Sequence, residues 1–192
     1  MNVALAEASL ALTGTLRLAR GDPGGIACFD ASIDGFWRSF RAAILCYPPY
    51  LILLAFPVVL GDGPVVEVDA VRFYAAETIH FVISWVAFPL VVLPIADFFG
   101  RGDRFLVFIT AYNWCQVPQT VLFAVVAVLG GMGVLSPNAM LSIDLILGIA
   151  ALAYEWFVAR VALAVTGPRA SLVILADVIL AVILSHISRA MY

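Results

Sequence analysis

The sequence predicts an all-α, polytopic transmembrane helical bundle with about five spans and a cytoplasmic N-terminus. Two observations on composition support this class: 64% of the 192 residues are hydrophobic and only 12% are charged. Soluble domains average about 45–50% apolar and 25% charged residues. The third observation is that the chain contains five apolar stretches, each near the length needed to cross a hydrocarbon core of roughly 30 Å. Most side chains are therefore expected to face lipid, or a core within lipid.

The predicted elements divide the chain into an N-terminal cytoplasmic or interfacial segment, residues 1–34, and a transmembrane domain, residues 35–188. Residues 2–20 predict a short interfacial helix or an amphipathic helix lying on the cytoplasmic surface. The break at 21–25 is rich in glycine. The five spans are expected at residues 36–60, 73–98, 105–129, 139–161 and 171–187.

The first span has the least regular sequence, because it contains Pro48, Pro49 and Pro57. Each proline removes a helical hydrogen bond and clashes with the preceding turn, so we expect this helix to be kinked or broken. The fifth span is short. Either of these two spans could enter and leave the membrane on the same side.

The stretch 72–129 forms the best-defined unit, a membrane hairpin whose two apolar legs are joined by the charged turn 99–104. Its arginines help to orient the protein, because cytoplasmic loops are enriched in basic residues. A cytoplasmic N-terminus places eight of the ten arginines inside and only Arg72 and Arg189 outside. Aromatic and arginine side chains near the cytoplasmic ends are predicted to anchor the helices at the lipid head groups. These candidate anchors are Trp37, Arg38, Arg41, Arg101 and Arg104.

Two local patterns give the chain a resemblance to a known family. The first consists of Gly100-Arg101-Gly102 followed by Tyr112 and Pro118, and the second runs from Tyr154 through Arg160 to 166–170. With the five-span layout, they make residues 30–188 similar to the bacterial branch of the Yip1 family of membrane proteins. The resemblance implies a bacterial cytoplasmic (inner) membrane location. That family has no established catalytic residues to carry over, and the proline-rich first span departs from its pattern.

Ionisable side chains inside the apolar spans need a reason, since each costs roughly 2.5–3.5 kcal/mol at mid-membrane. Glu77, His80 and Asp144, with His186, form a predicted outer polar layer. Glu77 and His80 share a helix face. They could belong to a hydrogen-bonded knot tying the second, fourth and fifth spans together, to a proton relay, or to half of a metal site. The second Glu-x-x-His pair of a di-metal centre is absent from the sequence, so no metal is predicted.

A second polar set lies nearer the cytoplasmic side. Asn113, Gln116 and Gln119 follow one another at intervals of three and form a stripe that either glues helices together or lines a cavity. Glu155 and Asp177 lie in the fourth and fifth spans. Asp177 needs Arg160, Asn113 or a proton as its partner, and Arg160 is the better cross-helix candidate for Asp177 or for lipid phosphate.

No enzyme template is present, since the chain lacks G-x-S-x-G, H-E-x-x-H and a glycine-rich phosphate loop. The leading hypothesis is a non-enzymatic scaffold, accessory subunit or membrane-organising protein without a cofactor. Its partners would be membrane lipids, other membrane subunits or copies of itself, and not nucleic acid. The alternative is a small transporter or channel for protons, ions or a lipid-like substrate. A weaker third hypothesis is an intramembrane metalloprotein.

Overall fold

The computed structural model describes residues 3–59 and 69–191, and every regular element in these residues is helical. This confirms the all-α class. The helices are α1 (Val3–Ala19), η1 (Pro23–Cys28), α2 (Ile33–Ser39), α3 (Arg41–Val59), α4 (Ala70–Phe98), η3 (Gly102–Arg104), α5 (Phe105–Gly131), α6 (Pro137–Ala162) and α7 (Gly167–Arg189). The predicted end of the first span at residue 60 lies outside the described residues.

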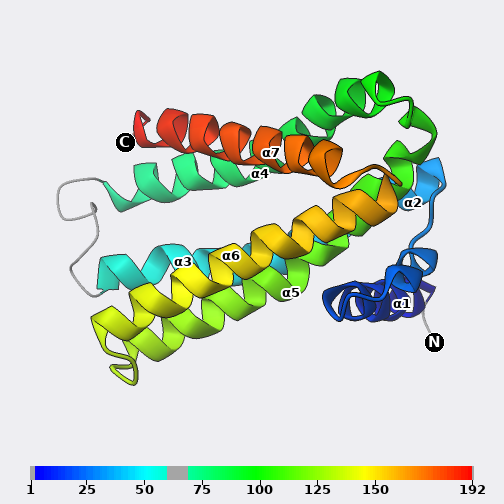
Figure 1. Ribbon diagram of the computed structural model, residues 1–192. Helices are drawn as coiled ribbons and strands as arrows, with labels where there is room; N and C mark the ends of the chain where they lie inside the picture. The colour runs from blue at the N-terminus through cyan, green and yellow to red at the C-terminus, as the bar shows by residue number, and fades with distance from the viewer. Residues whose placement is uncertain (1–2, 60–68, 192) are drawn as a thin grey trace.

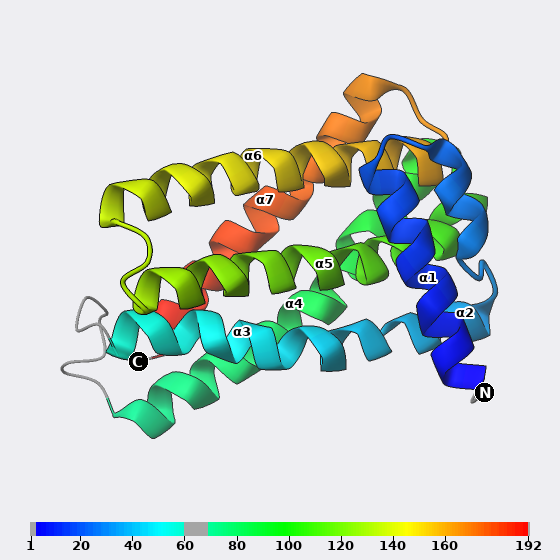
Figure 2. The ribbon, with the colours of Figure 1, turned by 90° about the horizontal axis from the view of Figure 1, so that it is seen from below.

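The long helices form two layers whose helices cross at an oblique angle (Figures 1 and 2). One layer consists of α4 packed on α7, and the other consists of α3, α5 and α6, with α5 between its neighbours. Contacts between α6 and α7 join the layers. Seen from below, α1 lies across one end of the bundle, where it packs against α5 and η1 (Figure 2).

Four helices in the described residues are long and apolar enough to cross a membrane. They are α4, η3 with α5 (Gly102–Gly131), α6 and α7. Helix α3, which corresponds to the predicted first span, packs along α5 but is not one of the four. The count of five spans and the cytoplasmic N-terminus therefore stay predictions.

Local sequence signals set the ends of these helices. Ser32 begins α2 by accepting a 3.0 Å hydrogen bond from the Gly35 amide, and Ser136 caps α6 in the same way. Gly100 ends α4 with φ of 68°, a left-handed conformation that glycine adopts without a Cβ clash. The Arg101 amide then donates to the Ala96 carbonyl at 2.8 Å, which is the bond of a Schellman motif. The predicted turn between the hairpin legs thus has a specific backbone cause.

The prolines disrupt the helix of the first span less than its sequence predicts. Helix α3 continues without a break through Pro48 and Pro49, so the alternative of a broken helix is wrong. Packing along α5 holds the chain helical where the local sequence weakens it. In α4, by contrast, the ribbon changes direction in its C-terminal half, which contains Pro89 and Pro94 (Figure 1).

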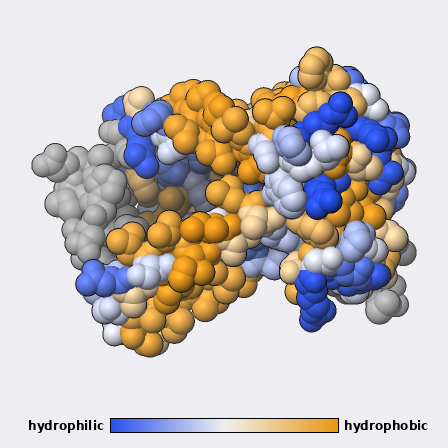
Figure 3. Space-filling model, viewed as in Figure 1, coloured by the Kyte–Doolittle hydropathy of each residue, from blue (hydrophilic) through white to orange (hydrophobic). Residues whose placement is uncertain are grey.

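The outer faces of the spans are apolar rather than polar. In the most apolar window of α6 only 11% of residues are buried inside the protein, and in α7 only 17%. Leu141, Leu145 and Ile149 lie exposed along α6. The space-filling view shows this apolar surface on both layers, with hydrophilic residues gathered mainly towards the ends of the bundle (Figure 3). Such faces match a lipid environment.

The N-terminal segment is docked rather than loose. Helix α1 buries Ala11, Thr15 and Leu18, which share one face, while Leu10 and Leu16 stay exposed. Charged groups fasten this helix to the start of the bundle. We call this arrangement of α1, η1 and α2 the N-terminal cap.

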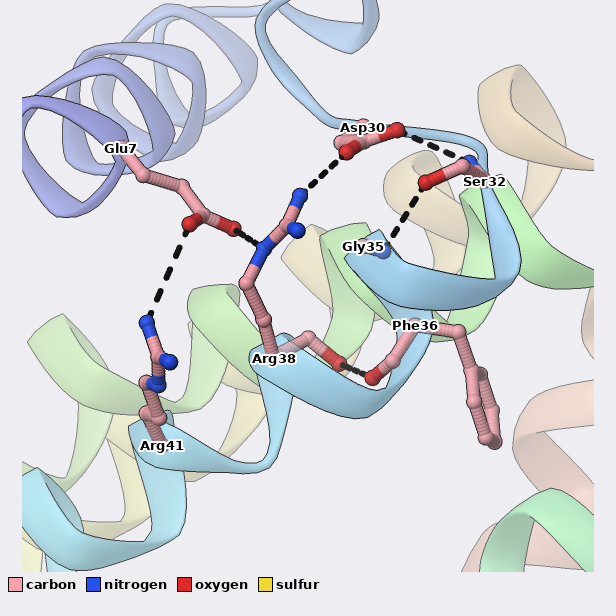
Figure 4. Close-up of polar contacts among 8 residues, drawn as sticks. Glu7, Asp30, Ser32, Gly35, Phe36, Arg38 and Arg41 are labelled. Atoms are coloured by element: carbon pink, nitrogen blue, oxygen red, sulfur yellow. Dashed lines mark hydrogen bonds and ion pairs between the residues drawn. The ribbon is translucent and has the colours of Figure 1, made fainter. Parts of the chain in front are cut away.

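Arg38 forms the ion pairs that connect α1 and the loop before α2 to the start of the bundle (Figure 4). Its Nε donates to Glu7 of α1 at 2.9 Å, and its Nη2 donates to Asp30 at 2.5 Å. Glu7 also faces Arg41 at 3.9 Å. Asp30 accepts a hydrogen bond from the Ser32 amide, and this bond, with the nearby Ser32 hydroxyl and Arg38, lowers the pKa of Asp30 below its usual value.

Candidate functional site

A cavity of about 390 Å³ lies between the two layers, bordered by α3, α4, α5, α6 and α7. We call it the central cavity. Figure 3 shows the surface hollowed between the two apolar lobes that the layers form. Its polar lining residues come from all five helices: Tyr50, His80, Ser84, Tyr112, Asn113, Gln116, Thr120, Glu155 and Asp177.

Two carboxyl groups from neighbouring helices face this cavity. Glu155 of α6 is 9% exposed, and Asp177 of α7 is half-buried. Tyr112 donates its hydroxyl proton to Asp177 Oδ2 at 2.7 Å, and Gln116 Nε2 donates to Glu155 Oε1 at 3.1 Å. Because Tyr112 and Gln116 are four residues apart on α5, they lie on the same face of that helix. One face of α5 thus orients both acids.

Neither acid is paired with a cation. Within the described residues, no arginine or histidine forms an ion pair with Glu155 or Asp177. Of the two predicted partners of Arg160, Asp177 is wrong, because Tyr112 bonds Asp177, whereas lipid phosphate stays a prediction. Arg160 is exposed, and its guanidinium lies over the ring of Trp156, 5.4 Å from the centroid. Arg160 stands near the C-terminal end of α6, where its long side chain reaches outwards from the bundle.

The outer polar layer exists in part, with different members. Glu77 accepts a 2.7 Å bond from the Tyr50 hydroxyl and a 2.9 Å bond from the Ser188 hydroxyl. It therefore ties α4 to α3 and to α7, which is the fifth predicted span. The predicted link between the second and fifth spans is present, but it runs through Ser188 rather than His186, and Asp144 of the fourth span takes no part in it. Asp144 and His186 are both exposed. The difference arises because α6 packs on α5 and α7 rather than on α4.

His80, the second member of the predicted pair, borders the central cavity. Its Nδ1 atom is buried and has no hydrogen-bond partner. No group of three or more potential metal ligands occurs among the described residues. The geometry of the Glu77 and His80 pair therefore gives no support to the metalloprotein hypothesis.

The predicted amide stripe has both of the roles that the sequence left open. Asn113 is buried and donates a 2.9 Å bond to Ser39 Oγ, which joins α5 to α2. Gln119 bonds the Cys115 carbonyl of its own helix. Gln116 donates a 3.1 Å bond to Glu155, one of the two acids that face the central cavity. The stripe therefore joins helices through Asn113, and its three amides also line the two cavities.

A second cavity of about 580 Å³ lies next to the first, between α3, α5 and α6. The two share Tyr50, Gln116, Thr120, Leu152 and Glu155 as lining residues. Asp144 borders only the second. Glu155 is thus the acidic residue at the boundary of both cavities.

The predicted interface anchors have varied contacts. Trp37 is 66% exposed, as a head-group anchor requires, whereas Arg38 is used by the N-terminal cap. Arg104 donates to the Ala162 carbonyl at 2.7 Å and so caps the C-terminal end of α6, where a cation is favoured. Arg101 is half-buried and Arg41 is exposed.

The candidate site residues predicted from the sequence include no tyrosine, yet tyrosine hydroxyls make several of the contacts described above. Tyr50 and Tyr112 hold Glu77 and Asp177, and Tyr154 donates to the Thr15 carbonyl of α1 at 2.9 Å. A buried tyrosine hydroxyl normally finds a partner, and Tyr112 precedes Gln116 by one helical turn. These were the available signals. A count of hydrophobic residues conceals these hydroxyl groups, because tyrosine is included among the hydrophobic residues.

The fold and this site define an all-helical protein in which four helices are long and apolar enough to cross a membrane and an acidic cavity lies between the helices. Comparison with known proteins adds no relative, since no family model, curated protein or solved structure matches the chain. The resemblance to the Yip1 family therefore stays a prediction.

Proposed function

We propose that this chain is a non-enzymatic integral membrane protein of five spans that binds and moves a small solute, as a small transporter or channel. The observation that carries the proposal is the pair Glu155 and Asp177, which face one cavity between apolar helices without an arginine or histidine ion pair. A purely structural bundle would gain stability by pairing such groups or replacing them with apolar residues.

The cost of these acids is the physical reason. An ionised carboxylate in an apolar medium must be offset by a cation or a proton. Tyr112 and Gln116 provide neutral hydrogen bonds, which orient the two carboxyl groups but supply no positive charge. A solute that carries positive charge, or a proton, would complete the site.

The proposed topology counts α3, the first span in chain order, together with α4, α5, α6 and α7, which gives five spans. Helix α3 runs beside α5 over the length between the two ends of the bundle (Figures 1 and 2). The η3 turn and the α6–α7 turn lie at the same end as α1, and the C-terminus lies at the other. The arginine-rich turns thus gather at one end, which supports a cytoplasmic N-terminus. A bacterial cytoplasmic membrane is part of the same proposal.

Transport is tested with purified protein in liposomes. We expect flux of protons or monovalent cations, read by a pH-sensitive dye and by ion-selective electrodes, to fall at least tenfold in Asp177→Asn and Glu155→Gln. Asp97→Asn is the matched control, because Asp97 is exposed at the end of α4 and borders neither cavity. Equal flux in all four proteins, or flux no faster than in empty liposomes for every solute tried, would refute the proposal.

A scaffold or accessory-subunit role of the Yip1-like kind is the second candidate. The N-terminal cap favours it, because Ile33 and Trp37 are each 66% exposed next to the exposed Arg41. This patch would contact lipid or another membrane subunit. Crosslinking in native membranes from positions 33 and 37 tests it, and recovery of lipid adducts alone would remove the protein partner.

A further inference from the structure

We propose that the solute of the central cavity is a lipophilic organic cation, namely a singly charged ammonium or phosphonium ion with apolar substituents. This inference rests on the proposed function of the cavity and names its class of substrate. Three features of the lining carry it: acids without counter-cations, an aromatic wall, and a volume far larger than a proton or bare metal ion needs.

The sign of the charge comes from the two acids. Glu155 and Asp177 border the same cavity from adjacent helices, and among the described residues no arginine and one histidine, His80, line it. A cavity of this kind rejects anions by repulsion and by the cost of leaving its carboxylates unpaired. It favours a ligand with positive charge.

Aromatic residues distinguish an organic cation from a hydrated inorganic one. Tyr50, Phe81, Trp85, Phe88 and Tyr112 all line the cavity. They form two groups of rings in contact: centroids are 4.9 Å apart for Tyr50 and Phe81 and 5.9 Å for Phe81 and Trp85 in the first, and 4.2 Å for Phe88 and Tyr112 in the second. Aromatic faces attract cations that shed their water easily, and they bind quaternary ammonium groups in many proteins.

The donor set argues against a hard metal ion as the ligand. Ca²⁺ takes six to eight oxygen ligands, as a general rule. Here the two acids are interspersed with aromatic and aliphatic side chains, including Leu152, Leu180 and Leu184. This apolar lining would leave a small ion without its coordination shell, whereas it would bury the substituents of an organic cation favourably.

The size agrees with such a ligand. The central cavity measures about 390 Å³, within the roughly 300–1,000 Å³ of small-molecule sites. The second cavity shares Glu155 with it and has apolar lining residues such as Leu53, Phe123 and Ile149. A cation held between Asp177 and Glu155 could place an apolar arm there. Proton transfer would need neither the volume nor the aromatic wall.

Tetraphenylphosphonium is the probe, with triphenylphosphine oxide as a neutral molecule that carries similar rings. Binding to the full-length protein in detergent is measured by isothermal titration calorimetry and by quenching of tryptophan fluorescence. We expect saturable binding of the phosphonium and at least tenfold weaker binding of the oxide. Asp177→Asn and Glu155→Gln should each weaken phosphonium binding at least tenfold, while Asp97→Asn should not.

A second pair of variants tests the aromatic wall. Trp85→Leu should weaken phosphonium binding about fivefold, consistent with loss of one cation–π contact, whereas Trp85→Phe should retain most of it. Helical content and thermal unfolding, followed by circular dichroism, verify that each variant is folded. Equal affinity for the phosphonium and the oxide would overturn the inference, as would phosphonium binding that is insensitive to both acid variants.

Failure of the organic-cation inference and failure of the transport proposal give different experimental results. If the liposomes carry protons or sodium through Asp177 while the folded protein does not bind the phosphonium, the transport proposal stands and the organic-cation inference fails. If the phosphonium binds through both acids but nothing crosses the membrane, the inference stands and the protein is a binding protein rather than a transporter.

Discussion

Tyr112 and Asp177 are 65 positions apart in the chain, and a 2.7 Å hydrogen bond joins the tyrosine hydroxyl to Oδ2 of the aspartate. The bond connects α5 to α7 across the central cavity. The ring of Tyr112 is stacked on Phe88 of α4, with centroids 4.2 Å apart, so its hydroxyl is held in place. One side chain therefore links three helices.

The first prediction concerns this bond. Tyr112→Phe keeps the ring and its stacking but removes the donor, so Asp177 loses the partner that orients it. We expect the free energy of unfolding to fall by about 1–3 kcal/mol, the range for a hydrogen bond to a charged or buried acceptor. Thermal unfolding in detergent measures the change.

Tyr74→Phe is the control for that experiment, because the Tyr74 hydroxyl forms no hydrogen bond within the described part of the chain. It should change the stability by less than about 0.5 kcal/mol. Equal losses in the two variants would show that the Tyr112 to Asp177 bond contributes nothing specific.

The second prediction concerns the outer layer. Ser188 is buried and donates to Glu77 at 2.9 Å, so Ser188→Ala removes a bond between α7 and α4. We expect a loss of about 1–2 kcal/mol. Ser185→Ala, on the same helix and less buried, should cost less, and chemical unfolding of the two variants side by side is the measurement. The idea fails if Ser185→Ala is the more damaging change.

The third prediction concerns the docking of α1. The Tyr154 hydroxyl lies 2.9 Å from the Thr15 carbonyl and 2.8 Å from Cys115 Sγ, so it joins α6 to α1 and α5. Tyr154→Phe should loosen α1 and leave the spans intact. We expect faster tryptic cleavage after Arg17 and Arg20, followed by mass spectrometry. Cleavage after Arg101 serves as the internal control and should be unchanged.

The fourth prediction is a pH effect on the N-terminal cap. The Ser32 amide and hydroxyl, with Arg38, lower the pKa of Asp30 in the folded protein below its usual value of 3.8. A depressed carboxyl pKa stabilises the fold above the unfolded pKa, and that stability is lost as the pH falls through the folded value. We therefore expect a full contribution of Asp30 above about pH 4 and a weaker cap below it.

Hydrogen exchange of the α1 amides, corrected for the intrinsic effect of pH, measures this loss. Asp30→Asn should reduce protection of α1 at neutral pH by severalfold at most, because the Asp30 side chain is 40% exposed and solvent screens its ion pair with Arg38. Asp103→Asn, in the η3 turn, should leave it unchanged, because Asp103 forms no ion pair with the N-terminal cap within the described residues. A cap whose protection is the same at pH 3 and pH 7 would contradict the prediction.

Much of the fold could be predicted from local sequence. The four apolar stretches from 73 to 187 correspond to α4, α5, α6 and α7, because span length and end signals such as Gly100 and Ser136 are local properties. The sequence also predicted a helix over residues 2–20, which corresponds to α1 (Val3–Ala19). The local sequence allowed a broken first span because of its prolines, but α3 continues through Pro48 and Pro49, since packing on α5 outweighs a local helix-breaking tendency.

The candidate site divides in the same way. The amino-acid sequence by itself determined that Glu155 and Asp177 lie within apolar helices, and therefore that each needs a partner. Only the tertiary structure decided that Tyr112 and Gln116 are those partners and that Arg160 is not. The length of a span follows from the hydropathy of its residues. The rotation of the helix about its own axis, which decides the face that points inwards, follows from packing against neighbouring helices.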